Sequence, residues 1–182
     1  MKGFEREDQL FSLCGLNCGL CPMKIGGYCP GCGGGAGNQS CAIAKCSLAH
    51  NNVKYCSRCG DFPCEKYQGI DDFDSFITHR NRRKDLQRAE EMGIEAYRAE
   101  QREKTEILTH LLEYYNDGRR KTLFCVAVNL LELESLQGIV MQLKNEAQGL
   151  SLGEKGRAAV HLLQEAAQAQ SIELTLRKKK NK

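Results

Sequence analysis

The chain has 182 residues, of which 41% are hydrophobic and 27% charged, and its formal net charge is +3 at pH 7. These values are typical of one soluble globular domain or of two small ones. The longest apolar-rich stretch, Leu123 to Leu133, is shorter than the roughly 20 apolar residues that a membrane-spanning helix needs. The charged start, MKGFEREDQLFSL, lacks the apolar core of a secretory signal. The sequence therefore predicts a cytoplasmic protein without a membrane partner.

Composition changes near residue 70. Residues 1–67 hold ten of the 11 cysteines and all three prolines, whereas residues 71–182 hold one cysteine and no proline. The first part is typical of loops and short elements arranged around metal, and the second is typical of helices. We therefore predict a small, irregular, metal-stabilised cysteine-rich module over residues 1–70. An all-α helical domain with a basic C-terminal tail is predicted over residues 71–182.

The cysteines of the first part include three C-x-x-C pairs. A C-x-x-C turn places two thiolates on one side of a tight loop, where both can reach one zinc ion at about 2.3 Å. Because cytoplasmic thiols stay reduced, such an array favours metal ligands over disulfides, and an extracellular disulfide framework is the alternative. The ten candidate metal ligands are Cys14, Cys18, Cys21, Cys29, Cys32, Cys41, Cys46, Cys56, Cys59 and Cys64.

Ten sulfurs suffice for two four-ligand sites with two cysteines left over. The pairing does not follow from order alone, because zinc folds often interleave their ligands. Our hypothesis takes one site from the group between Cys14 and Cys32 and the other from Cys41, Cys46, Cys56 and Cys59, with Cys64 belonging to either. Eight thiolates and two divalent ions change the charge by −4, from +3 to −1, which weakens the case for nucleic-acid binding.

The predicted role of the metal is structural. The first 70 residues carry few large apolar side chains, so a segment of this size gains too little from a core to fold well alone. Structural zinc contributes an apparent binding free energy of roughly 10–16 kcal/mol in small peptides at neutral pH. We therefore expect two zinc ions as cofactors.

A [4Fe–4S] cluster is the alternative cofactor. The spacing Cys14-x3-Cys18-x2-Cys21 is also the three-cysteine spacing of radical SAM enzymes. Those enzymes need a barrel of alternating strands and helices, and no such alternation follows Cys64. An electron-transfer cluster is thus favoured over radical chemistry among the iron–sulfur alternatives.

The motif order from residue 11 to residue 67 resembles a known prokaryotic family. The motifs are CGLNCGLCP from Cys14, CPGC from Cys29, CAIAKC from Cys41 and CSRCGDFPC from Cys56. This order is similar to that of the cysteine-rich domain of unknown function 3795, and the helical part is similar to the extension that many members carry. The resemblance implies a metal-binding domain, usually supposed to bind zinc, and implies no activity.

Two helical segments are predicted directly after the cysteine-rich part. The first covers residues 72–92, where Phe73, Phe76 and Ile77 form an apolar stripe, an aspartate caps the start and Gly93 ends the helix. The second covers residues 95–115, because its apolar side chains recur at helical spacing up to Tyr115.

Two further helical segments follow. Residues 119–148 are predicted as a helix broken near 132–135, and the apolar run TLFCVAVNLL within it indicates a buried helix because it does not alternate as a strand would. Cys125 in this run is expected to be a buried, inert thiol. The last helix begins at Ser151, which has Glu154 in capping-box spacing. SIELTL is predicted as a short strand or a final helical turn, followed by a solvated basic tail.

The remaining candidate residues favour binding over catalysis. His50 follows Cys46 by four residues, and a loop histidine is favoured over a metal ligand. The basic runs at 79–84 and 177–180 are the features that nucleic-acid binding needs, but acidic neighbours favour solvated faces. We find no catalytic set of residues. The sequence predicts a metal-binding interaction module whose partner is a protein or a second copy of the chain; an iron–sulfur, thiol-redox or metal-handling protein is the alternative.

Overall fold

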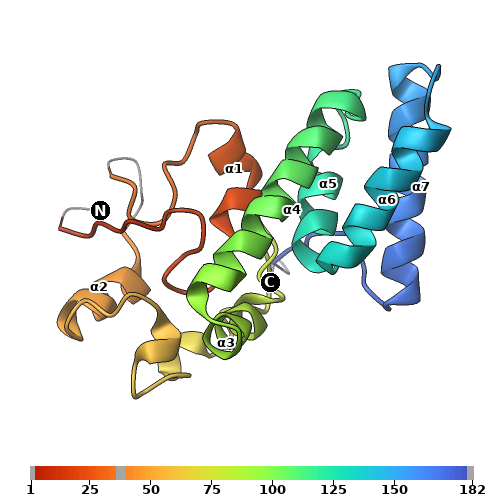
Figure 1. The fold of residues 1–182 in the computed structure, drawn as a ribbon. Helices are drawn as coiled ribbons and strands as arrows, with labels where there is room; N and C mark the ends of the chain where they lie inside the picture. The colour runs from red at the N-terminus through yellow and green to blue at the C-terminus, as the bar shows by residue number, and fades with distance from the viewer. Residues whose placement is uncertain (1–2, 36–39, 180–182) are drawn as a thin grey trace. The chain divides into compact units, whose positions relative to one another are not determined.

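The computed structural model describes residues 3–35 and 40–179 (Figure 1). In these ranges the chain is mostly helical, with seven α-helices, three short 3-10 helices and no strand apart from one isolated bridge between Phe11 and Asn17. None of the helices in these ranges has both the length and the hydropathy to cross a bilayer. The chain divides into two compact units, Met1–Ala99 with Arg177–Lys182, and Glu100–Leu176.

Short helices in the first unit begin at or next to cysteines. Cys18 and Cys56 open 3-10 helices, and Cys21, Cys41 and Cys64 each precede the first residue of a helix. The elements in chain order are η1 (Cys18–Leu20), α1 (Pro22–Ile25), α2 (Ala42–Ala49), η2 (Cys56–Arg58), η3 (Glu65–Tyr67), α3 (Arg82–Glu91) and the start of α4 (Ile94–Tyr114).

The first unit has an apolar core of its own. Phe11 stacks on the ring of Tyr55 with centroids 5.4 Å apart and contacts the ring of Tyr97 at 4.7 Å. Because Leu86 of α3 and Tyr97 of α4 pack into this core, the structural division falls after Ala99, whereas the composition changes at residue 70. The core consists of Phe4, Phe11, Leu13, Ile43, Ala44, Tyr55, Tyr67, Leu86, Ala89 and Tyr97.

The helix predicted from residue 72 begins ten residues later, at Arg82. Asp74 explains the difference, because its carboxylate accepts hydrogen bonds from the backbone N–H of His79 at 2.8 Å and of Arg177 at 2.8 Å. These bonds hold residues 74–79 in an irregular turn and fasten the segment at Arg177 to the first unit. The predicted apolar stripe was wrong in part: Ile77 is buried, whereas Phe73 and Phe76 are exposed. The predicted end was correct, since α3 ends at Glu91 and Gly93 has φ of +87°.

The second unit consists of packed helices, as the sequence predicted. The remainder of α4, α5 (Lys121–Leu130), α6 (Leu133–Glu146) and α7 (Leu152–Ala169) form it, with α7 packing on both α5 and α6. The predicted break in the helix over residues 119–148 falls between α5 and α6. Every residue from Phe124 to Leu130 is buried, including Cys125. Ser151 and Glu154 form the predicted capping box of α7. The segment SIELTL forms no strand, but the backbone N–H groups of Ser171 and Ile172 at its start donate to carbonyls of the last turn of α7.

Candidate metal centre

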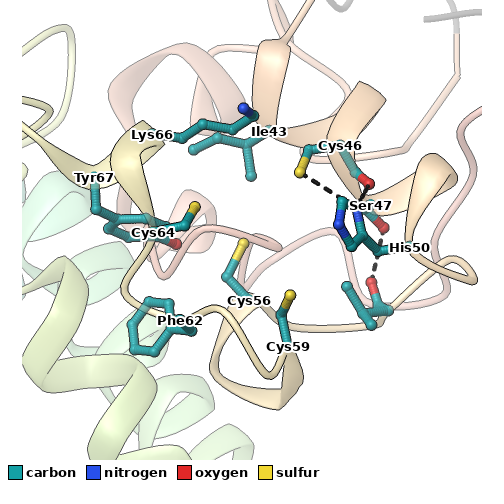
Figure 2. A pocket seen from close by; sticks show the side chains of 11 residues that line it. Ile43, Cys46, Ser47, His50, Cys56, Cys59, Phe62, Cys64, Lys66 and Tyr67 are labelled. Carbon is teal, nitrogen blue, oxygen red and sulfur yellow. Dashed lines mark hydrogen bonds between the residues drawn. The ribbon is translucent and has the colours of Figure 1, made fainter.

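Four cysteines from three elements of the first unit line one small pocket. Cys46 lies on α2, Cys56 begins η2, Cys59 follows η2 and Cys64 precedes η3. Figure 2 shows their sulfur atoms facing a common space. The volume of the pocket is about 20 Å³, which is close to the space that one water molecule or one ion occupies. The remainder of the wall is formed by Ile43, Val53, Phe62 and Tyr67 together with Ser47, His50 and Lys66.

Backbone hydrogen bonds fix the turns that carry these sulfurs. The N–H of Cys59 donates to the carbonyl of Cys56 at 3.0 Å, which closes the C-x-x-C turn, and the N–H of Tyr67 donates to the carbonyl of Cys64 at 2.9 Å. The N–H of Cys56 also donates to the carbonyl of Leu13 at 2.9 Å. The pocket is therefore attached to the apolar core and does not depend on a free loop.

The environment of Cys56 opposes a thiolate unless a cation is near. Burial raises the pKa of the Cys56 thiol to about 12, the Tyr67 hydroxyl lowers it by hydrogen bonding, and the thiols of Cys14, Cys64 and Cys46 raise it. The hydroxyl of Tyr67 also lies 3.2 Å from the carbonyl of Cys14, to which it donates. A cation in the pocket would offset both the burial and the mutual repulsion of the thiolates.

His50 lies at the edge of this pocket, at the end of α2. Its Nδ1 atom is 2.9 Å from the carbonyl of Cys46 and 3.6 Å from the Cys46 sulfur. Its Nε2 atom lies 3.8 Å from a carboxylate oxygen of Asp61. Both ring nitrogens thus have protein neighbours, which suits a histidine that caps a helix end.

The other cysteines of the array gather around a second, larger pocket in the same unit. Cys14, Cys18, Cys29, Cys32 and Cys41 line it, and its volume is about 210 Å³. Cys21 is not among the lining residues but lies near Cys18. The geometry thus differs from our sequence-based grouping at one position, because Cys41 lies with the earlier cysteines, and Cys64, which the sequence left open, lies with Cys46.

The cysteine sulfurs line common pockets, but they are not arranged as a complete set of metal ligands. None of the 11 cysteines forms a disulfide. Within residues 3–35 and 40–179, no three His, Cys, Asp or Glu side chains already have the mutual arrangement of a metal site. The donor chemistry of the small pocket nevertheless fits zinc, since four thiols surround the space of one ion.

A hydrogen-bonded network elsewhere in the first unit had no signal in the sequence. Asp8 accepts from the hydroxyl of Tyr55 at 2.6 Å and from Arg98 Nε at 3.0 Å. Burial works to raise the pKa of Asp8, but hydrogen bonds from the Phe11 backbone, Tyr55 and Arg98 leave it below its ordinary value. These partners are up to 90 residues apart in the chain, so no local motif could have indicated them.

The basic run at 79–84 is engaged within the first unit. Arg82 is buried, and its Nε atom lies 3.2 Å from a carboxylate oxygen of Asp71. Arg83 Nε lies 3.3 Å from the other oxygen of the same carboxylate. Asp71 therefore offsets part of the positive charge that the sequence places here.

Comparison of the chain with protein-family models, curated proteins and solved structures gave no match. The resemblance to the domain of unknown function 3795 stays a hypothesis, and function is inferred from the geometry of the pockets.

Proposed function

We propose that the chain binds one structural zinc ion through Cys46, Cys56, Cys59 and Cys64, and that the metal holds the surface of an interaction module in shape. The observation that supports this proposal is the pocket of about 20 Å³ that these four cysteines line. Thiolates are the ligands that select zinc among the common divalent ions, and four of them complete a tetrahedron.

A site closed by four protein ligands leaves no coordination position for a substrate. This arrangement is typical of structural zinc, whereas catalytic zinc keeps a position open for water. The chain's own residues then have simple roles. The cysteines would hold the ion, the Tyr67 hydroxyl would share its one proton between the Cys14 carbonyl and the Cys56 thiolate, and Ile43, Val53 and Phe62 would limit the access of water.

The metal would cross-link α2 with the turns at η2 and η3. The turn at residues 50–52 and the stretch 57–61 are largely exposed, and residues 46–64 include only one short α-helix, α2. Cross-linking this stretch at four points would order its exposed side chains into one surface. We propose that a protein partner or a second copy of the chain binds this surface.

Metal analysis of protein purified without oxygen tests the zinc site. We expect the double variant Cys56→Ser Cys59→Ser to lose one equivalent of zinc per chain relative to the unaltered protein. The matched control is Cys125→Ser, since Cys125 is buried in α5 of the other unit, and it should retain all of its metal. Zinc content that is equal in the double variant and the control would contradict the proposal, as would purified protein without bound metal.

Removal of the Tyr67 hydroxyl is expected to weaken zinc binding. The outer partners of metal ligands typically contribute about 10–100-fold to affinity, so Tyr67→Phe should lower zinc affinity by that factor. The ring remains to fill the buried space, and the measurement is a competition titration against a chromophoric chelator. Phe62, whose ring packs edge-on against Tyr67 at 4.9 Å, provides the control, because Phe62→Leu removes no hydrogen-bond donor and should change affinity less. An unchanged affinity in Tyr67→Phe would show that the hydroxyl does not act on the site.

A further inference from the structure

The second cysteine pocket is about ten times larger than the first. Five cysteines line its volume of about 210 Å³, against about 20 Å³ for the pocket of Cys46. A single ion occupies roughly the space of one water molecule and would contact only part of such a wall. The size of this pocket therefore indicates a ligand with several atoms, and a wall rich in sulfur indicates a metal–sulfur core.

Four of the cysteines are the best-placed ligands for such a core. Cys14, Cys18, Cys29 and Cys32 all line the pocket, and each of these residues is half-buried. Cys41 also lines the pocket but is exposed, and Cys21 does not line it. Cys21 and Cys41 are thus the two cysteines in excess of two four-ligand sites.

A buried arginine supplies a second, independent observation. Arg6 is only 8% exposed, and its Nη atoms donate to the carbonyls of Asp8 at 2.9 Å, Phe11 at 2.8 Å and Lys54 at 3.0 Å. Its buried Nε atom has no hydrogen-bond partner of standard geometry among the described residues. The neighbouring carboxylate, Asp8, forms its ion pair with Arg98.

Arg6 lies directly beside the wall of the pocket. Its backbone N–H donates to the carbonyl of Gly33, the residue after Cys32, at 3.3 Å. Gly33, which lines the pocket with φ of +78°, makes this approach possible, because a Cβ there would lie 2.8 Å from both the N and Cγ atoms of Arg6. A buried cation without a carboxylate partner is costly, so anionic sulfur in the pocket would stabilise it.

We propose that this pocket binds a [4Fe–4S] cluster through Cys14, Cys18, Cys29 and Cys32, with Arg6 as its buried counter-charge. Cysteine thiolates are the usual ligands of such clusters, and hydrogen bonds and nearby charges tune the cluster potential. The apolar neighbours Phe4, Leu13, Leu16, Ile43 and Ala44 line the same pocket and would shield the cluster from water. This site shares no ligand with the zinc site, although Ile43 lines both pockets.

Reconstitution of the full chain with ferric iron, sulfide and a thiol reductant, without oxygen, tests the proposal. We expect about four irons and four acid-labile sulfides per chain, a broad visible absorption band, and a paramagnetic signal after reduction with dithionite. A stoichiometry of two irons, of one iron, or of zinc alone in this pocket would overturn the proposal. Because the unaltered protein is used, the result does not depend on whether a variant folds.

Paired variants distinguish this site from the zinc site. Cys18→Ser should lose the iron and keep the zinc, whereas Cys56→Ser should lose the zinc and keep the iron. Cys41→Ser is the matched control at the wall of the same pocket and should keep all four irons. Loss of iron in Cys41→Ser with retention in Cys18→Ser would contradict the assigned ligands.

Arg6 is expected to act on the cluster as a positioning charge. Arg6→Gln removes the positive charge beside Cys32, so reduction of the cluster becomes harder and its midpoint potential shifts to a more negative value. Arg6→Lys restores the positive charge and should reverse most of the shift in midpoint potential. A merely structural role of Arg6 would not explain such a reversal. Equal potentials in the unaltered protein and Arg6→Gln, at equal iron content, would show that Arg6 is not the counter-charge.

Discussion

Removal of bound metal with a strong chelator is expected to unfold the cysteine-rich segment while the helices of the second unit stay folded. The cysteine-rich stretch consists of turns and helices of three to eight residues, and isolated helices of this length are not stable in water. Structural zinc contributes roughly 10–16 kcal/mol of apparent binding free energy, which is comparable to the whole stability of a typical domain.

The second unit should be insensitive to the same treatment. Its helices bury side chains of their own, among them Leu111, Phe124, Leu136 and Leu163, and ten of the 11 cysteines lie outside it. Limited proteolysis followed by mass spectrometry measures both parts in one experiment. We expect cleavage sites to appear between residues 12 and 67 and residues 100–176 to remain protected.

Readdition of zinc is the control for this experiment, and protection of the region around Cys56 should return with about one equivalent. A chelated protein whose first 70 residues remain resistant to protease would contradict a structural role for the metal. The apolar core around Phe11 would then be sufficient to hold this segment, and the cysteines would need another explanation.

The tight turns that carry the cysteines of the first unit were predictable from the sequence, but the grouping of the sulfurs was not. The C-x-x-C spacing of Cys56 and Cys59 predicts a tight turn, and the structure has that turn as η2. Cys64 lies in the same pocket because η3 returns the chain toward α2. Cys41 and Cys46 line different pockets because Cys41 precedes α2, whereas Cys46 lies within this helix. Such returns depend on tertiary contacts, for example that of Cys56 N with the Leu13 carbonyl, which no local pattern encodes.

The same distinction applies to the helices. The capping box at Ser151 and the apolar run of α5 are local signals, and both predictions were confirmed. The segment at 72–81 also has a helical apolar pattern, but Asp74 bonds to Arg177, 103 residues away, and this contact outweighs the local preference. Arg6 and Tyr67 were missed for the same reason, since their partners are carbonyls and thiols of distant segments.

Phe11→Ala is expected to lower the free energy of unfolding of the first unit by about 3–5 kcal/mol, the usual cost of removing a buried phenylalanine ring. Phe11 is 1% exposed and contacts the rings of both Tyr55 and Tyr97, so its removal leaves a cavity that rigid aromatic neighbours cannot close. Urea unfolding of the metal-loaded protein measures the change, and the matched control is the adjacent Leu10→Ala, which should cost less than about 1 kcal/mol because Leu10 is 44% exposed.

This comparison separates the core from the metal as sources of stability. Phe11 lines neither cysteine pocket, so Phe11→Ala should retain the metal content of the unaltered protein while its unfolding transition moves to lower urea. Only the transition of the first unit should move, since the described residues that form the core around Phe11 all belong to that unit. Equal stability of the two variants would mean that the metal sites alone hold the first unit together. Loss of metal in Phe11→Ala would instead mean that the core positions the ligands, so that folding of the core and metal binding are a single step.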